Sequence, residues 1–180
     1  IQVRNFSFLH RYFFYLLKFS INIVPSNTLK NELEKQGIKA LFLSNFSTLF
    51  YLNKKKLIKS SNNKKEINIL WNSNILYSKG FYHLSEALLD IYNRGFQKFK
   101  FQILGRIIPD KDFDLSEYIS KLKENKFVDY LGPVDNEKSY KYLIESDIVA
   151  LPSFYKTECQ PLALIDAMAA NKFLLVSNNK

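Results

Sequence analysis

From residue 66 onward, short apolar runs alternate with stretches whose apolar residues recur at helical spacing. The runs are Ile67–Trp71, Phe99–Leu104, Phe127–Leu131, Ile148–Leu151 and Phe173–Val176, and the helical patterns lie near 80–94, 112–124, 136–145 and 161–170. Runs that are apolar on both faces are typical of a parallel sheet covered by helices on both sides. The pattern therefore predicts an α/β fold with a doubly wound, Rossmann-like parallel sheet.

The first 53 residues carry a separate, smaller pattern. It predicts a helix over about 5–19, a strand over 20–24, a helix over about 27–36 and a strand near 40–43. Pro25 and Ser26 fit a strand-to-helix turn, and Gly37 fits a helix end. Residues 54–65 are rich in Lys, Ser and Asn and show neither helical nor strand periodicity, which indicates a linker. The predicted parts are thus 1–53, the linker 54–65, and 66–180.

Composition narrows the classes of protein that remain. A chain of 180 residues with 47% hydrophobic residues can bury a core, and the lone Cys159 excludes a disulfide scaffold. The net charge of +9 indicates either a phosphate-rich partner or a compositional drift towards lysine. No secretory signal pattern is recognisable, so we expect a cytoplasmic location. The aromatic, basic residues 5–19 offer attachment to a membrane surface as an alternative to packing on a core.

Ligands of open parallel sheets bind at the carboxyl ends of the strands, so the loops there are candidate sites. The first loop contains Asn74 and Lys79, and a lysine next to Gly80 at a helix start suits a phosphate. The alternative for Lys79 is a solvated lysine. The second loop contains Gly105 and Arg106, where a small residue lets a ligand approach the backbone, or where the chain simply turns.

The third loop, residues 152–161, precedes the last predicted helix. It places Glu158 before that helix and Asp166 inside it, with backbone amides of residues 160–163 between the two carboxylates. Amides suit a diphosphate, and carboxylates accept hydrogen bonds from sugar hydroxyls. The alternatives are a dipole-stabilised acid for Glu158 and a partly exposed helix residue for Asp166. Cys159 is interpreted as a packing residue, and no Gly-x-Gly-x-x-Gly follows any predicted strand, which disfavours a dinucleotide cofactor.

Several stretches together resemble one family. They are Ser78-Lys79-Gly80, residues 129–133 (Asp-Tyr-Leu-Gly-Pro), residues 146–153 (Ser-Asp-Ile-Val-Ala-Leu-Pro-Ser), and Glu158 followed by Asp166-Ala167-Met168-Ala169. In this order and spacing they resemble the C-terminal, donor-binding domain of the retaining nucleotide-sugar glycosyltransferases of the GT-B fold, group 1 (family 4). Residues 1–53 look like the end of that family's N-terminal, acceptor-side domain.

The resemblance implies transfer of a sugar from a nucleotide diphosphate donor to an acceptor hydroxyl, with retention of the anomeric configuration. The catalytic residues are then Lys79, which contacts the diphosphate, and Glu158, which contacts the donor sugar, while Asp166 holds the ribose hydroxyls. The other donor-binding residues are Asn74, Gly105, Arg106, Gln160, Pro161 and Leu162. Stabilising the leaving diphosphate is the main catalytic task, and that group helps to activate the acceptor. No metal or other cofactor is expected.

The expected partners are a nucleotide-sugar donor and a sugar, lipid-linked or other hydroxyl acceptor, as in polysaccharide biosynthesis, with no nucleic acid. Two departures from the family pattern stand out: Asp166 replaces a Glu, and Asn74 replaces an Arg, so Lys79 or Arg106 must supply the missing charge. The resemblance also implies that the chain is a fragment with little activity of its own. Two alternatives remain: a non-catalytic sugar-nucleotide-binding module, and a basic α/β domain that binds nucleic acid or a membrane surface.

Overall fold

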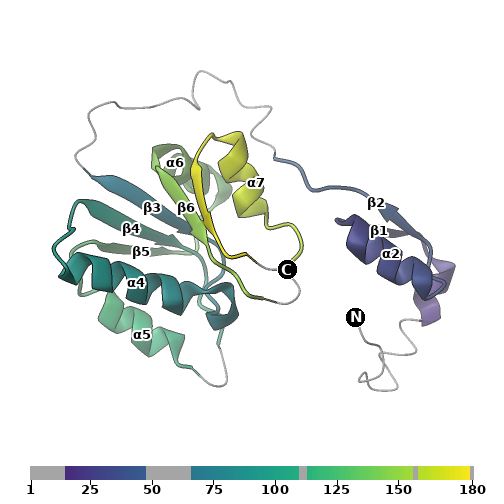
Figure 1. Ribbon diagram of the computed structural model, residues 1–180, viewed down its shortest axis with the longest axis horizontal. Coiled ribbons are helices and arrows are strands. Elements are labelled where there is room, and N and C mark those ends of the chain that lie inside the picture. Colours follow the sequence, from purple (N-terminus) through teal and green to yellow (C-terminus); the bar gives the residue numbers. More distant parts are fainter. Residues whose placement is uncertain (1–14, 48–65, 110–112, 156–157, 179–180) are drawn as a thin grey trace. The chain divides into compact units, whose positions relative to one another are not determined.

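The computed structural model describes residues 15–47, 66–109, 113–155 and 158–178 (Figure 1). The chain divides into two compact units, and the division falls between Phe46 and Ser47. The linker predicted over 54–65 lies outside the described residues. So does most of the helix predicted over 5–19, of which the structure describes the end, with a short 3-10 helix η2 (Leu17–Phe19).

In its described residues the smaller unit contains two parallel strands and the helix between them, close to where the pattern predicts a strand, a helix and a strand. These are β1 (Asn22–Val24), α2 (Asn27–Lys35) and β2 (Ala40–Phe42). Ser26 caps α2, because its hydroxyl accepts a hydrogen bond from the Leu29 amide at 3.1 Å. In the part of the chain that the structure describes, no helix is long and apolar enough to cross a membrane.

The larger unit is built on a five-stranded sheet in which every pairing is parallel. Its strands are β3 (Ile67–Asn72), β4 (Phe99–Leu104), β5 (Val128–Gly132), β6 (Ile148–Leu151) and β7 (Phe173–Val176), in the spatial order β5-β4-β3-β6-β7. The chain adds strands outward from β3 on one side and then crosses to the other side at β6. The switch point of the sheet therefore lies between β3 and β6, where ligands of such sheets bind.

Helices cover both faces of the sheet (Figure 1). They are α4 (Phe81–Asn93), α5 (Leu115–Leu122), α6 (Asn136–Glu145) and α7 (Leu162–Ala169), and a 3-10 helix η4 (Tyr77–Lys79) precedes α4. Alternate residues of β3 enter opposite cores: Trp71 packs with α4 and α5, whereas Leu70 packs with α6 and α7. The predicted doubly wound α/β sheet is confirmed. The helix predicted over 112–124 is shorter as α5, because Asp114 caps it through the amides of Ser116 and Glu117.

Two glycines allow the loops at the carboxyl ends of the strands to pack backbone against backbone. A Cβ atom at Gly80 would overlap the carbonyl oxygen of Pro152, and one at Gly105 would overlap that of Ser73. Both glycines have positive φ, +81° and +140° respectively. The Phe154 amide also donates to the Ser78 carbonyl at 2.9 Å, which ties the loop after β6 to the loop after β3. Glycine at these two positions is thus a requirement of the loop geometry.

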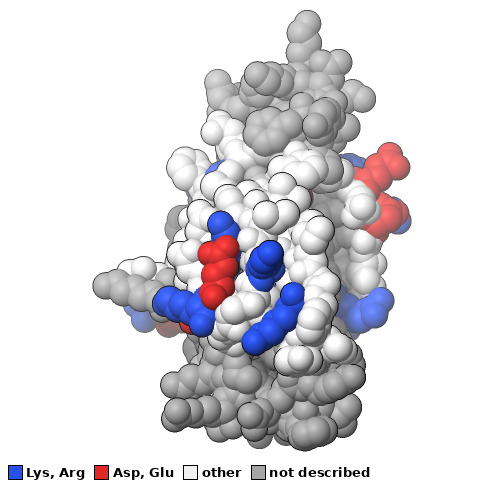
Figure 2. Space-filling view, turned by 90° about the vertical axis from the view of Figure 1, so that its right-hand side faces the viewer, with Lys and Arg blue, Asp and Glu red and all other residues white. Residues whose placement is uncertain are grey.

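On the face shown in Figure 2, basic side chains lie as separate spots between uncharged residues, and some lie beside acidic ones. Lys30 and Lys35 of α2 are paired with Glu34 and Glu32. Exposed pairs of this kind contribute little to stability. On this face the charge of the chain does not gather into the continuous basic stripe that is typical of a nucleic-acid interface.

We predict that Gly80→Ala destabilises the larger unit much more than Gly95→Ala does. Both glycines have positive φ, but a Cβ at Gly95 meets nothing within 4 Å. The left-handed backbone alone costs an alanine about 1–2 kcal/mol, and forced overlap adds about 1–3 kcal/mol. Urea unfolding followed by the fluorescence of Trp71, the single and fully buried tryptophan, measures both variants. An equal loss in the two would show that the contact with Pro152 is unimportant.

Candidate functional site

Lys79 and Glu158 form an ion pair at the switch point of the sheet. The Lys79 ammonium lies 3.3 Å from Glu158 Oε2, and the two side chains are only 16% and 18% exposed. Two serines hold the pair: Lys79 donates to Ser73 Oγ at 2.9 Å, and Ser153 donates to Glu158 Oε2 at 3.2 Å. The structure therefore brings together the two residues that the sequence analysis predicts to be catalytic.

The local backbone explains why Lys79 lies there. The 3-10 turn η4 closes through the hydrogen bonds from Lys79 to the Leu76 carbonyl and from Gly80 to the Tyr77 carbonyl. Gly80 then takes the left-handed conformation, and α4 begins at the next residue. This abrupt turn from η4 into α4 leaves the lysine at the end of the loop after β3, opposite the loop after β6.

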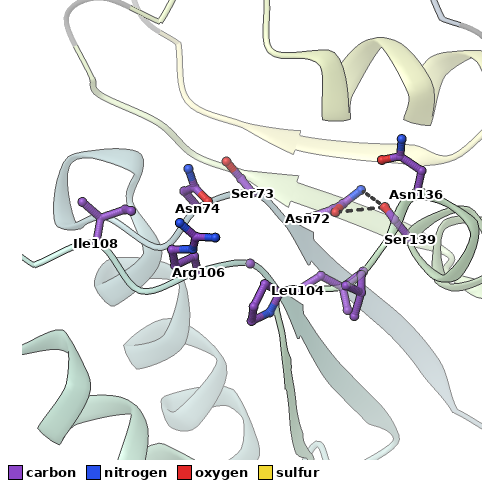
Figure 3. Close-up of a pocket in the computed structure, with 11 residues that line it drawn as sticks. Asn72, Ser73, Asn74, Leu104, Arg106, Ile108, Asn136 and Ser139 are labelled. Carbon is purple, nitrogen blue, oxygen red and sulfur yellow. Dashed lines mark hydrogen bonds between the residues drawn. The ribbon is translucent and has the colours of Figure 1, made fainter.

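A pocket of about 450 Å³ lies next to this pair, at the carboxyl ends of β3, β4 and β5 (Figure 3). It is lined by Asn72, Ser73, Asn74, Leu104, Gly105, Arg106, Ile108, Pro133, Val134, Asn136 and Ser139. Ser73 belongs both to this lining and to the hydrogen-bond network of Lys79. The pocket and the ion pair are therefore connected through Ser73, and we treat them as one candidate site.

Polar side chains fix the wall of the pocket near α6. Asn72 donates to the Ser139 hydroxyl at 2.9 Å, and this hydroxyl donates back to Asn72 Oδ1 at 3.2 Å (Figure 3). These two bonds join the end of β3 to the first turns of α6.

The opposite wall carries Asn74 and Arg106, whose loops are joined by the hydrogen bond from the Ile75 amide to the Arg106 carbonyl at 2.8 Å. Arg106 is the one charged residue of the lining, so the pocket has a positive character. Among the described residues, no ion pair or side-chain hydrogen bond engages its guanidinium.

Tyr130 contacts the backbone of Gly105, a residue of the pocket lining. Its hydroxyl donates to the Gly105 carbonyl at 3.4 Å. Burial raises the pKa of Tyr130 above its ordinary value.

The predicted residues of the third loop and the last helix form a separate group. Pro161 is the N-cap residue of α7, Leu162 is exposed in its first turn, and Gln160 is half-buried before it. Asp166 is half-buried in the second turn and accepts a hydrogen bond from the Ser47 hydroxyl at 2.6 Å. None of these four residues lines the pocket. The predicted set thus falls into an ion pair, a pocket wall and the start of α7.

Sequence reasoning missed the residues that support the predicted ones. Ser73 and Ser153 lie in the loops that the sequence analysis identified as candidate sites. Their position in these loops was the only sign that they could contact Lys79 and Glu158. Ser47 gave no signal, because it lies 119 positions from Asp166 in the chain. The hydrogen-bonded pair Asn72 and Ser139 is likewise visible only once α6 packs beside β3.

The described residues contain no group of three His, Cys, Asp or Glu side chains that would hold a metal ion. Cys159 is free and exposed, so the interpretation of this residue as a packing residue is wrong. It lies in the loop before α7, where its side chain meets solvent.

Comparison with known proteins places the chain among relatives that share this fold. No curated protein sequence matches it. Sucrose-phosphate synthase from Thermosynechococcus elongatus is 16% identical (TM-score 0.68), and the match covers 92% of this chain and 42% of that one. A glycosyltransferase from Rickettsia africae is 22% identical (TM-score 0.68), with 98% and 49% covered. Anabaena HepE, in complex with UDP and glucose, is 16% identical (TM-score 0.63), with 93% and 47% covered.

The chain thus spans less than half the length of each of these three proteins, and at these identities the likeness is one of fold. The sequence model of the family described as "Glycosyl transferases group 1" matches residues 53–180, which contain the five-stranded sheet, the ion pair and the pocket. This chain belongs to the group 1 glycosyl transferases.

Proposed function

We propose that this protein transfers a sugar from a nucleoside diphosphate donor to an acceptor hydroxyl, with retention of the anomeric configuration. The observation that carries the proposal is the enclosed pair of Lys79 and Glu158, which adjoins a pocket at the switch point of the sheet. A cation suits the diphosphate of the donor, and a carboxylate suits the hydroxyls of its sugar. Family membership supports this reading of the pair.

The pocket next to the pair suits the nucleoside part of the donor. Its volume of about 450 Å³ is that of a small-molecule site, and its lining combines amide and hydroxyl side chains with apolar ones. Arg106 adds a positive charge on the wall that it shares with Asn74. The family pattern has an arginine where this chain has Asn74. We assign the phosphate pairing of that arginine to Arg106. Asp166 and the backbone of Gln160, Pro161 and Leu162 complete the proposed donor site from α7.

The proposed reaction forms one bond and breaks one. The acceptor oxygen bonds to the anomeric carbon of the sugar, and the bond from that carbon to the diphosphate oxygen breaks. The diphosphate leaves with the electron pair of that bond, and the acceptor proton passes to one of its oxygens. Lys79 and Arg106 stabilise the negative charge that develops on the leaving group. We expect no metal ion in this step.

Relatives of similar fold support a nucleotide-sugar donor, since Anabaena HepE has been crystallised with UDP and glucose. The acceptor is a sugar, lipid-linked or other hydroxyl compound, and the setting that we propose is polysaccharide biosynthesis in the cytoplasm. Release of nucleoside diphosphate from a nucleotide sugar, measured beside simple binding, separates a transferase from a module that only binds the donor.

We predict that Lys79→Ala weakens the binding of nucleoside diphosphates by roughly 10- to 100-fold, as expected for a hydrogen bond to a charged group. Ligand-observed NMR or calorimetry with UDP, GDP and ADP measures this on the chain itself. The matched control is Lys121→Ala, since Lys121 also pairs with a glutamate, Glu117, but on the exposed face of α5. Trp71 fluorescence confirms that both variants are folded.

The double variant Lys79→Ala/Glu158→Ala separates attraction by the lysine from repulsion by an uncompensated Glu158. We expect binding to stay weak in the double variant, because the ammonium itself is the ligand. Full recovery of affinity in the double variant would contradict that assignment, and failure of the folded wild type to bind any of the three nucleotides would overturn the proposed function.

We predict that Glu158→Ala removes the advantage of a nucleotide sugar over the bare nucleoside diphosphate. The bare nucleotide should bind as tightly as in the wild type or more tightly, because Lys79 loses its internal partner. Affinities for UDP and UDP-glucose, or for the corresponding pair of whichever base binds best, give the ratio. Glu117→Ala is the matched control. An unchanged ratio in Glu158→Ala would show that this carboxylate does not touch the sugar.

We predict that Arg106→Ala weakens binding of the nucleoside diphosphate by about tenfold while the affinity for the unphosphorylated nucleoside stays the same. Arg94→Ala is the control, because Arg94 is an exposed arginine paired with Asp90 at the end of α4. Calorimetric titration with the two ligands measures the difference. Equal losses for both ligands would assign Arg106 to the base rather than to the phosphates.

A further inference from the structure

The hydrogen bond between Ser47 and Asp166 has no place in the function proposed so far. Ser47 is the first residue of the larger unit and is only 1% exposed. Its hydroxyl donates to Asp166 Oδ1 at 2.6 Å, across 119 positions of sequence. A buried hydroxyl that meets a carboxylate from so far along the chain restricts the side chain that it contacts.

The length of this bond is that of a charge-assisted O–H···O⁻ interaction, which is shorter and stronger than one between neutral groups. The terminal torsion of an aspartate is otherwise broad, so a partner on one oxygen fixes the plane of the carboxylate. Within the described part of the chain, this is the one hydrogen bond that the side chain of Asp166 makes. Its second oxygen, Oδ2, therefore keeps its capacity to accept a hydrogen bond from a ligand.

The hydrogen bond from Ser47 also accounts for an aspartate, rather than the longer glutamate, at position 166. The carboxylate of Asp166 lies within hydrogen-bond distance of a serine that is itself held in a buried position. A glutamate at this place on α7 would carry its carboxylate one methylene further from the helix and away from this arrangement. Ser47 and the shorter acid are thus matched to each other.

We infer that Ser47 is a positioning residue, which orients Asp166 so that Oδ2 accepts hydrogen bonds from the ribose hydroxyls of the donor. The inference rests on the proposed function, and in particular on the place of Asp166 in the donor site. The role proposed for Ser47 requires no contact of its own with the donor. Ser47 acts through Asp166 by holding the carboxylate in one orientation before the nucleotide arrives, which reduces the entropy lost on binding.

The test compares a nucleoside diphosphate with its 2′,3′-dideoxy analogue, which lacks the hydroxyls that Asp166 would bind. The nucleotide is whichever of UDP, GDP and ADP the chain binds best. We expect the wild type to prefer the ribonucleotide, and we expect Ser47→Ala to lower this preference about fivefold, as befits one lost hydrogen bond. The affinity for the dideoxy analogue should stay the same, which a general loss of structure would not allow.

The matched control is Ser146→Ala. Ser146 is also 1% exposed and also donates a hydrogen bond, to the Leu143 carbonyl, but it lies before β6 at the far end of that strand from the site. Ser146→Ala should leave the ribose preference unchanged. Asp166→Ala should abolish the preference, and Ser47→Ala should add nothing to it in the double variant, because the serine acts only through the acid.

Asp166→Glu provides a second test that leaves the buried serine in place. Lengthening the acid should lower the ribose preference, because the carboxylate loses its fixed orientation. A preference that stays the same in both Ser47→Ala and Asp166→Glu would overturn the inference, as would equal weakening of both nucleotides in Ser47→Ala. If Ser47→Ala alone fails to fold, Asp166→Glu decides. Failure of the folded wild type to bind either nucleotide would instead overturn the proposed function.

Discussion

The packing of backbone against backbone at the carboxyl ends of the strands is the constraint on which the site depends. Gly80 allows the loop after β3 to meet Pro152 of the loop after β6, and Gly105 allows the loop after β4 to meet Ser73. Three loops are therefore locked together without any intervening side chain. Lys79 and Glu158 can form a pair only because these loops lie so close, and Ser73 connects that pair to the pocket.

The sheet and its helices could be predicted from the sequence because their signals are local. β4, β6 and β7 begin and end where their apolar runs do, and α6 begins and ends where its helical pattern does. Such runs are long enough to define strands, and caps such as Asp114 mark helix starts. The expectation of burial on both faces is wrong for β7, whose four residues are exposed at the edge of the sheet. The exposure of Cys159 could not be predicted in this way, because local sequence does not say which side of a loop faces solvent.

The site was predictable only in part, because its residues come from separate loops. Lys79 and Glu158 could each be proposed from their positions near the start of a helix. The family resemblance then assigned both residues to one donor site. Their direct contact follows from the switch of strand order between β3 and β6, which no stretch of sequence encodes by itself. The contact of Ser47 with Asp166 is more remote still, since it requires the folded position of α7.

The pairing of Lys79 with Glu158 also determines which charges the site presents to solvent. Glu158 is an internal counterion: it occupies the ammonium that an incoming phosphate would use. Under the proposed function, donor binding is an exchange of one anion for another, in which the phosphate displaces the carboxylate. Under the same proposal, inorganic anions gain little from this exchange, because they have no sugar to offer the released Glu158. Under this proposal, an ammonium that is already paired with a carboxylate discriminates against ions that carry only charge.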